Sequence, residues 1–88
     1  MLFKIYSVYD SKIEAYMPPL FLRSHGEAIR MFESAVLSVD HQFAKNPEDY
    51  CLFYLGTWDD IKALSEMLLT PQPLAKANEV IARQASAA

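Results

Sequence analysis

The chain has few sulfur and imidazole groups and no excess of positive charge. Its 88 residues include one cysteine, Cys51, and two histidines, His25 and His41. A single cysteine excludes an internal disulfide, and one thiol with two imidazoles is too small a set for a structural zinc site. Eight Lys and Arg against eleven Asp and Glu give a formal net charge of −3. This balance argues against nucleic-acid binding through net charge, although it leaves enough cations for a local basic stripe.

Long apolar runs are also missing. None approaches the roughly 20 residues that cross a bilayer, and residues 1–10 lack the pattern of a signal peptide. We therefore expect a soluble protein in a reducing cytoplasm, without membrane contact. The length suits one domain, 1–88, with a core over about 2–74 and a C-terminal helix or arm over 74–88. A domain this small buries only about 60% of its unfolded surface, so it needs a compact core or a partner subunit.

The first 22 residues have the pattern of a strand and a short return. Residues 2–9 are rich in aromatic and β-branched types and end at a turn-forming Asp-Ser-Lys, which predicts a strand. Residues 13–16 are predicted to pair with it as a hairpin. Pro18 and Pro19 exclude a central strand position, so the segment through Leu22 is predicted to be an edge or an extended connection.

Residues 25–38 carry the strongest helical pattern. Ser24 and Glu27 fit a capping box, in which each side chain satisfies a free backbone N–H group. Apolar residues then recur at helical spacing and form one stripe, which predicts an amphipathic helix packed on a sheet. The apolar stripe consists of Ala28, Ile29, Phe32, Ala35, Val36 and Val39.

The next segment, residues 41–50, is polar and turn-forming. Asn46-Pro47 is a turn signal, and Phe43 is predicted to anchor this helix-to-strand connection to the core. A second strand is predicted over residues 50–58. Strict alternation would place two apolar or aromatic sets on its two faces. One set consists of Tyr50, Leu52, Tyr54, Gly56 and Trp58, and the other of Cys51, Phe53, Leu55 and Thr57.

Residues 61–69 fit a helix or a strand equally well. Thr70-Pro71-Gln72-Pro73 is predicted to end whatever element precedes it, and residues 74–83 to form a short amphipathic helix followed by a frayed tail, 84–88. Together these elements predict a small α+β fold. An antiparallel sheet would pack against one main amphipathic helix, with a minor C-terminal helix.

Several blocks of sequence are familiar when taken together. They are IYSVYDSKIEAYMPPLF at 5–21, HGEAIRMF at 25–32, HQFAKNPEDYCLFYLGTWDD at 41–60 and TPQPL at 70–74. In this order and spacing they resemble the small nonstructural VP5 or ORF5-type protein of gokushovirus-like microviruses. The resemblance covers roughly residues 4–75.

The resemblance implies a viral protein in the cytoplasm of an infected bacterium. The family is described as DNA-binding, with a proposed part in the synthesis or packaging of a single-stranded DNA genome. It implies no enzyme activity and no cofactor, and it favours a strand for residues 63–68. It supplies no established binding residues.

The residues themselves suggest where single-stranded DNA would bind. Proteins of this kind combine a basic groove with aromatic faces on which bases stack. If the two long strands are neighbours, Lys4, Tyr6, Tyr54 and Trp58 would form such a platform. Four cations in or near loops are candidates for phosphate contacts. They are Lys12, Arg23, Lys45 and Lys62. The same aromatic residues could instead pack a core or the interface of a homodimer, which the apolar strand faces also favour.

Other candidate sites are weaker. Asp49 and Asp59 are expected to accept backbone N–H bonds in turns, although paired carboxylates could also hold a metal. His41 and Cys51 have no catalytic signature around them, and a thiol within an apolar strand behaves as a small hydrophobe. We expect no enzyme activity. The rival to DNA binding is an interaction module for a viral or host protein, which the acidic pI and the acidic residues at both ends of the strand favour.

Overall fold

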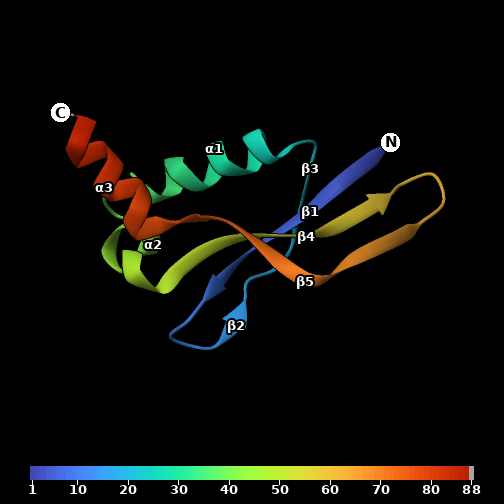
Figure 1. The fold of residues 1–88 in the computed structure, drawn as a ribbon, viewed down its shortest axis with the longest axis horizontal. Coiled ribbons are helices and arrows are strands. Elements are labelled where there is room, and N and C mark those ends of the chain that lie inside the picture. The colour runs from blue at the N-terminus through green and yellow to red at the C-terminus, as the bar shows by residue number, and fades with distance from the viewer. Residues whose placement is uncertain (88) are drawn as a thin grey trace.

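The computed structural model describes residues 1–87, which form one antiparallel sheet and several helices (Figure 1). The elements, in chain order, are β1 (Leu2–Asp10), β2 (Ala15–Tyr16), β3 (Leu20–Leu22), α1 (His25–Val36), α2 (Gln42–Lys45), the 3-10 turn η1 (Pro47–Asp49), β4 (Tyr50–Asp59), β5 (Leu64–Lys76) and α3 (Ala77–Ala87). The predicted α+β class is therefore confirmed. Among residues 1–87, no helix is long and apolar enough to cross a membrane.

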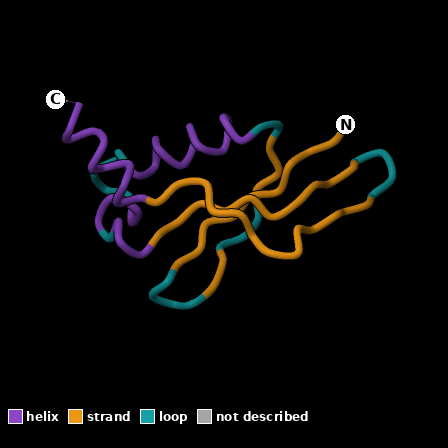
Figure 2. The backbone as a smooth tube through the Cα atoms, viewed as in Figure 1, coloured by secondary structure: helices purple, strands orange, loops and turns teal. Residues whose placement is uncertain are grey.

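The sheet has the order β2-β1-β4-β5, and β3 pairs with β1 as well (Figure 2). All of its pairings are antiparallel. As predicted, β2 returns along β1 as a hairpin, with Tyr9 opposite Tyr16. The segment after the two prolines forms the short edge strand β3, which agrees with the expectation that Pro18 and Pro19 exclude a central position.

Helix α1 confirms the predicted cap and ends two residues before the predicted boundary. The Ser24 hydroxyl accepts the Glu27 N–H, and the Glu27 carboxylate accepts the Arg23 N–H, so both side chains satisfy backbone donors. The helix ends at Val36, and Leu37 caps its C-terminus through bonds to Glu33 and Ala35 carbonyls.

The connection over residues 41–49 is more regular than expected, because it contains the one-turn helix α2 and the turn η1. His41 caps α2: its Nδ1 accepts the Phe43 N–H at 3.1 Å. Phe43 is buried and packs against Phe32 and Tyr50, with ring centroids 5.6 and 4.5 Å away. The predicted anchoring role of Phe43 is confirmed.

The C-terminal third differs from the prediction. Residues 61–63 form a turn, and β5 then runs from Leu64 to Lys76, through Pro71 and Pro73. The prolines are tolerated because β5 is an edge strand, where N–H groups on the outer side need no partner. Helix α3 therefore begins at Ala77, three residues after the predicted start, and continues through Ala87. The last residue of the predicted tail lies outside the described residues.

The core lies between the sheet and the helices. From α1, Ala28, Phe32 and Val36 pack against strand residues, and α3 adds Ala77 and Val80. The strand contribution consists of Tyr6, Val8, Tyr50 and Leu52. Because side chains alternate along a strand, this core uses only one face of β1 and β4.

Candidate nucleic-acid interface

A bulge in β4 decides which side chains share a face. On β1, Ile5 lies opposite Gly56 and Tyr6 lies opposite Tyr54, so Leu55 has no partner of its own. An extra residue of this kind reverses the alternation beyond it. On the face that carries Tyr6, the side chains of β4 therefore come from even-numbered residues before the bulge and from odd-numbered residues after it.

The structure does not bring the four predicted platform residues together, because the bulge moves Trp58 to the other side of the sheet. Trp58 pairs with Phe3 and contacts Phe21, with the ring centroids 6.2 Å apart. Tyr6 and Tyr54 remain together on the helix-covered face, where their ring centroids are 5.5 Å apart. Lys4 lies on that face too, two residues from Tyr6. No single surface carries all four residues.

Tyr6 is a core residue with a polar contact. Its side chain is 0% exposed, and its hydroxyl hydrogen-bonds to His25 Nδ1 at 2.6 Å. The His25 ring also packs against Tyr54, with centroids 4.6 Å apart. Burial, with smaller contributions from Tyr54 and Glu27, raises the pKa of Tyr6 to about 12. Tyr6 therefore joins the sheet to the start of α1 and is closed to a stacking base.

The four predicted phosphate ligands lie in separate parts of an elongated molecule of 45 × 27 × 21 Å. Lys12 is in the β1–β2 turn, Lys45 ends α2, and Lys62 is in the β4–β5 turn. Arg23 lies before α1 and forms an ion pair with Glu27 at 3.2 Å. The structure does not gather these residues into one basic cluster.

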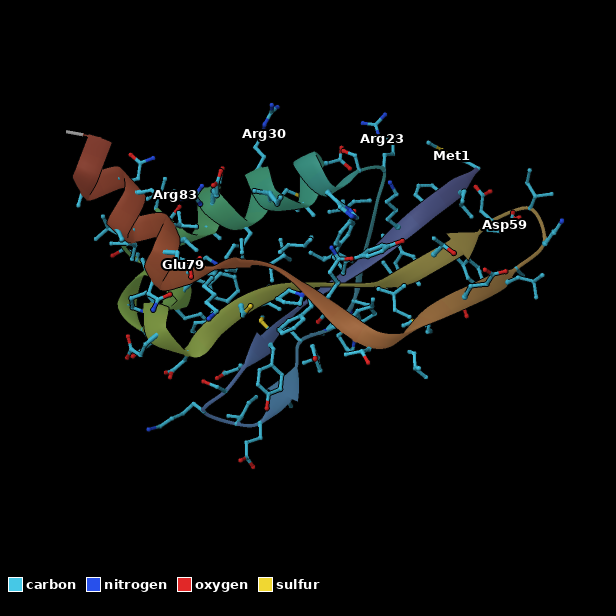
Figure 3. The ribbon with its side chains drawn as sticks, viewed as in Figure 1. Met1, Arg23, Arg30, Asp59, Glu79 and Arg83 are labelled. Atoms are coloured by element: carbon cyan, nitrogen blue, oxygen red, sulfur yellow. The ribbon has the colours of Figure 1, made fainter. Side chains whose placement is uncertain are left out.

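The arginines lie mainly on the helix side of the molecule. Figure 3 shows Arg23 and Arg30 pointing away from the sheet, and Arg83 on α3. Arg83 forms an ion pair with Glu33 of α1 at 3.0 Å. Two of these three charges are thus paired with acidic residues of α1. Near the far end of the sheet, the amino group of Met1 forms an ion pair with Asp60.

The contacts of Asp59, His41 and Cys51 are those of structural residues. Asp59 Oδ1 accepts the N–H groups of Ile61 and Lys62, as expected for a turn residue. His41 packs on Phe43. Cys51 of β4 lies opposite Lys76 of β5. Burial raises the pKa of the Cys51 thiol, which keeps the thiol in its less nucleophilic protonated form.

The sheet face opposite the helices carries most of the remaining aromatic side chains. We call it the open face, because within residues 1–87 the core helices pack on the other face. It is defined by cross-strand pairs and contacts among Phe3, Ile5, Ser7, Tyr9, Tyr16, Phe21, Phe53 and Trp58. An antiparallel sheet with one solvated face usually carries polar side chains there, so this aromatic content needs an explanation.

Two aromatic groups lie on the open face. In the first, Tyr16 contacts Tyr9 and Phe53, with centroids 4.9 and 5.5 Å away. In the second, Phe21 contacts Trp58. A shallow groove of about 440 Å³ reaches from Tyr16 to Trp58, and its floor includes Ile5, Ser7 and the bulged Leu55. Tyr16 is 43% exposed and Phe21 47% exposed, so a flat ligand has access to both rings.

The sequence interpretation missed Tyr9, Tyr16, Phe21 and Phe53 as candidate site residues. Alternation alone places Tyr9 on the face of β1 opposite to Tyr6, and Phe53 on the face of β4 opposite to Tyr54. It also missed Lys76, which follows Tyr9 and Cys51 in one cross-strand row and so lies at the rim of the open face. That row depends on where β5 pairs with β4, and no local pattern specifies this.

The chain was compared with known proteins. No match was found among curated proteins or among solved structures. Residues 3–80 match the family model described as Phage ORF5 protein. Because this match covers most of the 88 residues, the chain belongs to the Phage ORF5 protein family and is a phage protein.

Proposed function

We propose that this phage protein binds single-stranded DNA by stacking bases on the open face. On this proposal it is a nonstructural protein of the microvirus type. It acts in the cytoplasm of the infected bacterium during synthesis or packaging of the genome, by binding and without catalysis. The observation that supports the proposal best is the pair of aromatic groups, Tyr9/Tyr16/Phe53 and Phe21/Trp58, on the sheet face that the core helices leave open.

Stacking suits this surface because it needs flat apolar rings and no particular base. Each base that stacks on an aromatic side chain contributes about 1–3 kcal/mol. Tyr16 and Phe21 are the most exposed rings of the two groups and stand on neighbouring edge strands, β2 and β3. The groove between them is lined by Ile5, Leu55 and Met67, so it suits the face of a base better than a phosphate.

Phosphates would be held at the rim. Lys76 ends the row that contains Tyr9, and Lys12 lies in the turn that precedes Tyr16. Neither lysine forms an ion pair within residues 1–87. Two or three phosphate contacts give a single-strand salt slope of about −1.4 to −2, so a rise from about 50 to 200 mM salt lowers affinity roughly 7-fold to 16-fold.

The test is a titration of the purified chain with a labelled single-stranded oligothymidine, followed by fluorescence anisotropy and by the emission of Trp58. The double variant Tyr16→Ala/Phe21→Ala should bind at least roughly 30-fold more weakly, since it removes two stacking positions. Val39→Ala is the matched control: Val39 is 84% exposed and lies between α1 and α2, away from the sheet. It should bind like the wild type.

A second variant tests the phosphate contacts at the rim without disturbing the fold. Lys76→Glu changes an exposed side chain at the rim and should weaken binding while leaving the thermal midpoint near that of the wild type. Binding of the duplex form of the same oligonucleotide should be weaker than binding of the single strand. Absence of single-strand binding at low salt, or equal binding by the double variant, would contradict the proposal.

A second candidate function is supported by the charge of the same surface. None of the residues that line the groove of the open face carries a charged side chain. A neutral aromatic surface also suits a viral or host protein partner. If the chain acts as such an interaction module, partner binding depends weakly on salt, is lost in Tyr16→Ala/Phe21→Ala, and is accompanied by no affinity for single-stranded DNA.

A further inference from the structure

A polar pocket lies at one end of the open face, where four segments of the chain meet. They are the end of β1, the turn η1, the start of β4 and the junction between β5 and α3. Figure 1 shows the start of α3 beside the start of β4, where Cys51 of β4 pairs with Lys76 of β5. The pocket has a volume of about 190 Å³. Its lining includes Tyr9, Glu48, Asp49, Cys51, Lys76 and Asn78.

The pocket adjoins the surface on which bases would stack. Tyr9, Cys51 and Lys76 form one cross-strand row, so their side chains share the open face. Tyr9 also belongs to the first aromatic group, in which its ring centroid lies 4.9 Å from that of Tyr16 and 6.3 Å from that of Phe53. The neighbour of a base stacked on this group therefore comes to the pocket.

Backbone hydrogen bonds hold the acidic side of the pocket in place. The Asp49 carbonyl accepts the Ser11 N–H at 2.9 Å, which ties η1 to the turn after β1. The Asp49 N–H donates to the Asn46 carbonyl at 3.1 Å. The side chains of Glu48 and Asp49 therefore extend from a backbone segment that is fixed to its neighbours.

The charged groups of the pocket remain available to a ligand. Glu48, Asp49 and Lys76 form no ion pair within residues 1–87. Asp10, at the end of β1, is by contrast engaged, because its carboxylate accepts the Lys12 N–H at 3.0 Å. Two carboxylates and one ammonium group give the lining an excess of one negative charge. The pocket therefore disfavours an anion and suits a neutral group that donates hydrogen bonds.

The edge of a nucleobase with an exocyclic amino group has this chemistry. Carboxylates accept hydrogen bonds from the N4 amino group of cytosine, whereas the O4 carbonyl of thymine is itself an acceptor. In a single strand this edge has no pairing partner and is open to side chains. Asn78 adds an amide donor for the acceptor atoms of the same base, and Lys76 adds a cation for the phosphate.

The size of the pocket favours a single ring. Pockets for drug-sized ligands have volumes of about 300 Å³ or more, and this one is smaller. Adenine also carries an amino group, but its two fused rings need more space. Cytosine is the base that combines one ring with an amino group.

We propose that the pocket formed by Glu48, Asp49 and Asn78 binds one cytosine of the strand that stacks on the open face. The inference rests on the proposed single-strand binding and adds base selection to it. Stacking on Tyr16 and Phe21 accepts any base, whereas the pocket distinguishes cytosine from thymine.

The test compares oligodeoxycytidine with oligodeoxyuridine, each of about eight nucleotides, at neutral pH. The two strands share the sugar, the phosphates and the ring size, and they differ along the edge formed by ring positions 3 and 4. By fluorescence anisotropy, the wild type should bind the cytosine strand at least about fivefold more tightly, which is the lower bound for one well-made base contact.

Isosteric variants identify the groups that select the base. In Glu48→Gln/Asp49→Asn the preference for cytosine should fall below about twofold, because an amide can turn to offer either a donor or an acceptor. The loss of negative charge should also strengthen the binding of both strands. Glu66→Gln is the matched control: it removes one charge from an exposed position on β5, outside the pocket, and should keep the wild-type preference.

The outcomes separate base selection from stacking. Equal affinities of the wild type for the two strands, or a preference that the double variant keeps, would overturn the cytosine pocket and leave the stacking proposal standing. A preference that Glu66→Gln also removes would assign the effect to overall charge and would overturn selection by the pocket. Absence of binding to both strands would overturn the stacking proposal and this inference together.

Discussion

The two glycines of the chain should respond oppositely to the same substitution. Gly56 follows the bulge in β4, where the backbone of β5 passes very close. A Cβ atom at Gly56 would lie 2.2 Å from the Glu66 carbonyl oxygen and 2.8 Å from the Met67 Cα. Both contacts are with backbone, so no side chain can rotate away to relieve them.

The loss of stability can be bounded in two ways. Overpacking of a well-packed site lowers stability by about 1–3 kcal/mol. The alternative is that β5 separates from β4 beyond the bulge, which breaks the cross-strand pairs from Gly56–Met67 to Asp59–Leu64. Four such pairs contribute about 1–4 kcal/mol together. For Gly56→Ala we therefore expect a loss of about 2 kcal/mol, which lowers Tm by roughly 8–16 °C in a domain of this size.

Gly26→Ala is the matched control. Its Cβ would approach only the Ser24 hydroxyl, at 3.9 Å, and the residue lies in the first turn of α1. Alanine is favoured over glycine in a helix by about 0.5–1 kcal/mol, so this variant should raise Tm by roughly 2–8 °C. Thermal unfolding followed by circular dichroism measures both variants. A Gly56→Ala protein at least as stable as the wild type would refute the assignment of a close β4–β5 approach at this bulge.

Two further predictions concern the start of α1. Tyr6 keeps its proton in the fold up to a pKa of about 12, whereas its ordinary value is 10.0, so its contribution to stability is complete below about pH 10 and is lost as pH rises towards 12. Urea unfolding between pH 8 and 11.5 should therefore show a decline that Tyr6→Phe makes shallower, and an unchanged slope in that variant would contradict the assignment. Ser24→Ala removes the hydroxyl that accepts the Glu27 N–H and should lower the free energy of unfolding by about 1 kcal/mol. The control Ser34→Ala, at an exposed position within α1, should not destabilise the protein, and equal losses in the two serine variants would argue against the cap.

The elements that the sequence predicted well depend on local physics. Helix α1 was recognisable because a serine cap and an apolar stripe lie within one short segment. The strands β1 and β4 were recognisable from their aromatic and β-branched residues, and the short β2 from the turn before it. The burial of Phe43 was also predictable, since it is the one large apolar residue in a polar connection.

The elements that the sequence left open depend on distant partners. Residues 64–69 became a strand because β4 offers an edge to which they hydrogen-bond, and the same edge position allows Pro71 and Pro73 to stay within β5. The leucine, methionine and serine residues of this segment are compatible with either a helix or a strand. The choice between them was therefore made by long-range pairing.

The candidate site shows the same division. The sequence alone determined that aromatic residues alternate along two strands, that the cations are few and scattered, and that the chain forms a small α+β domain. Only the tertiary structure decided that Tyr6 is buried against His25 and that Trp58 faces the open side with Phe21. The physical reason is the extra residue at Leu55, which reverses the alternation of β4 and is visible only once β4 is aligned with β1 and β5.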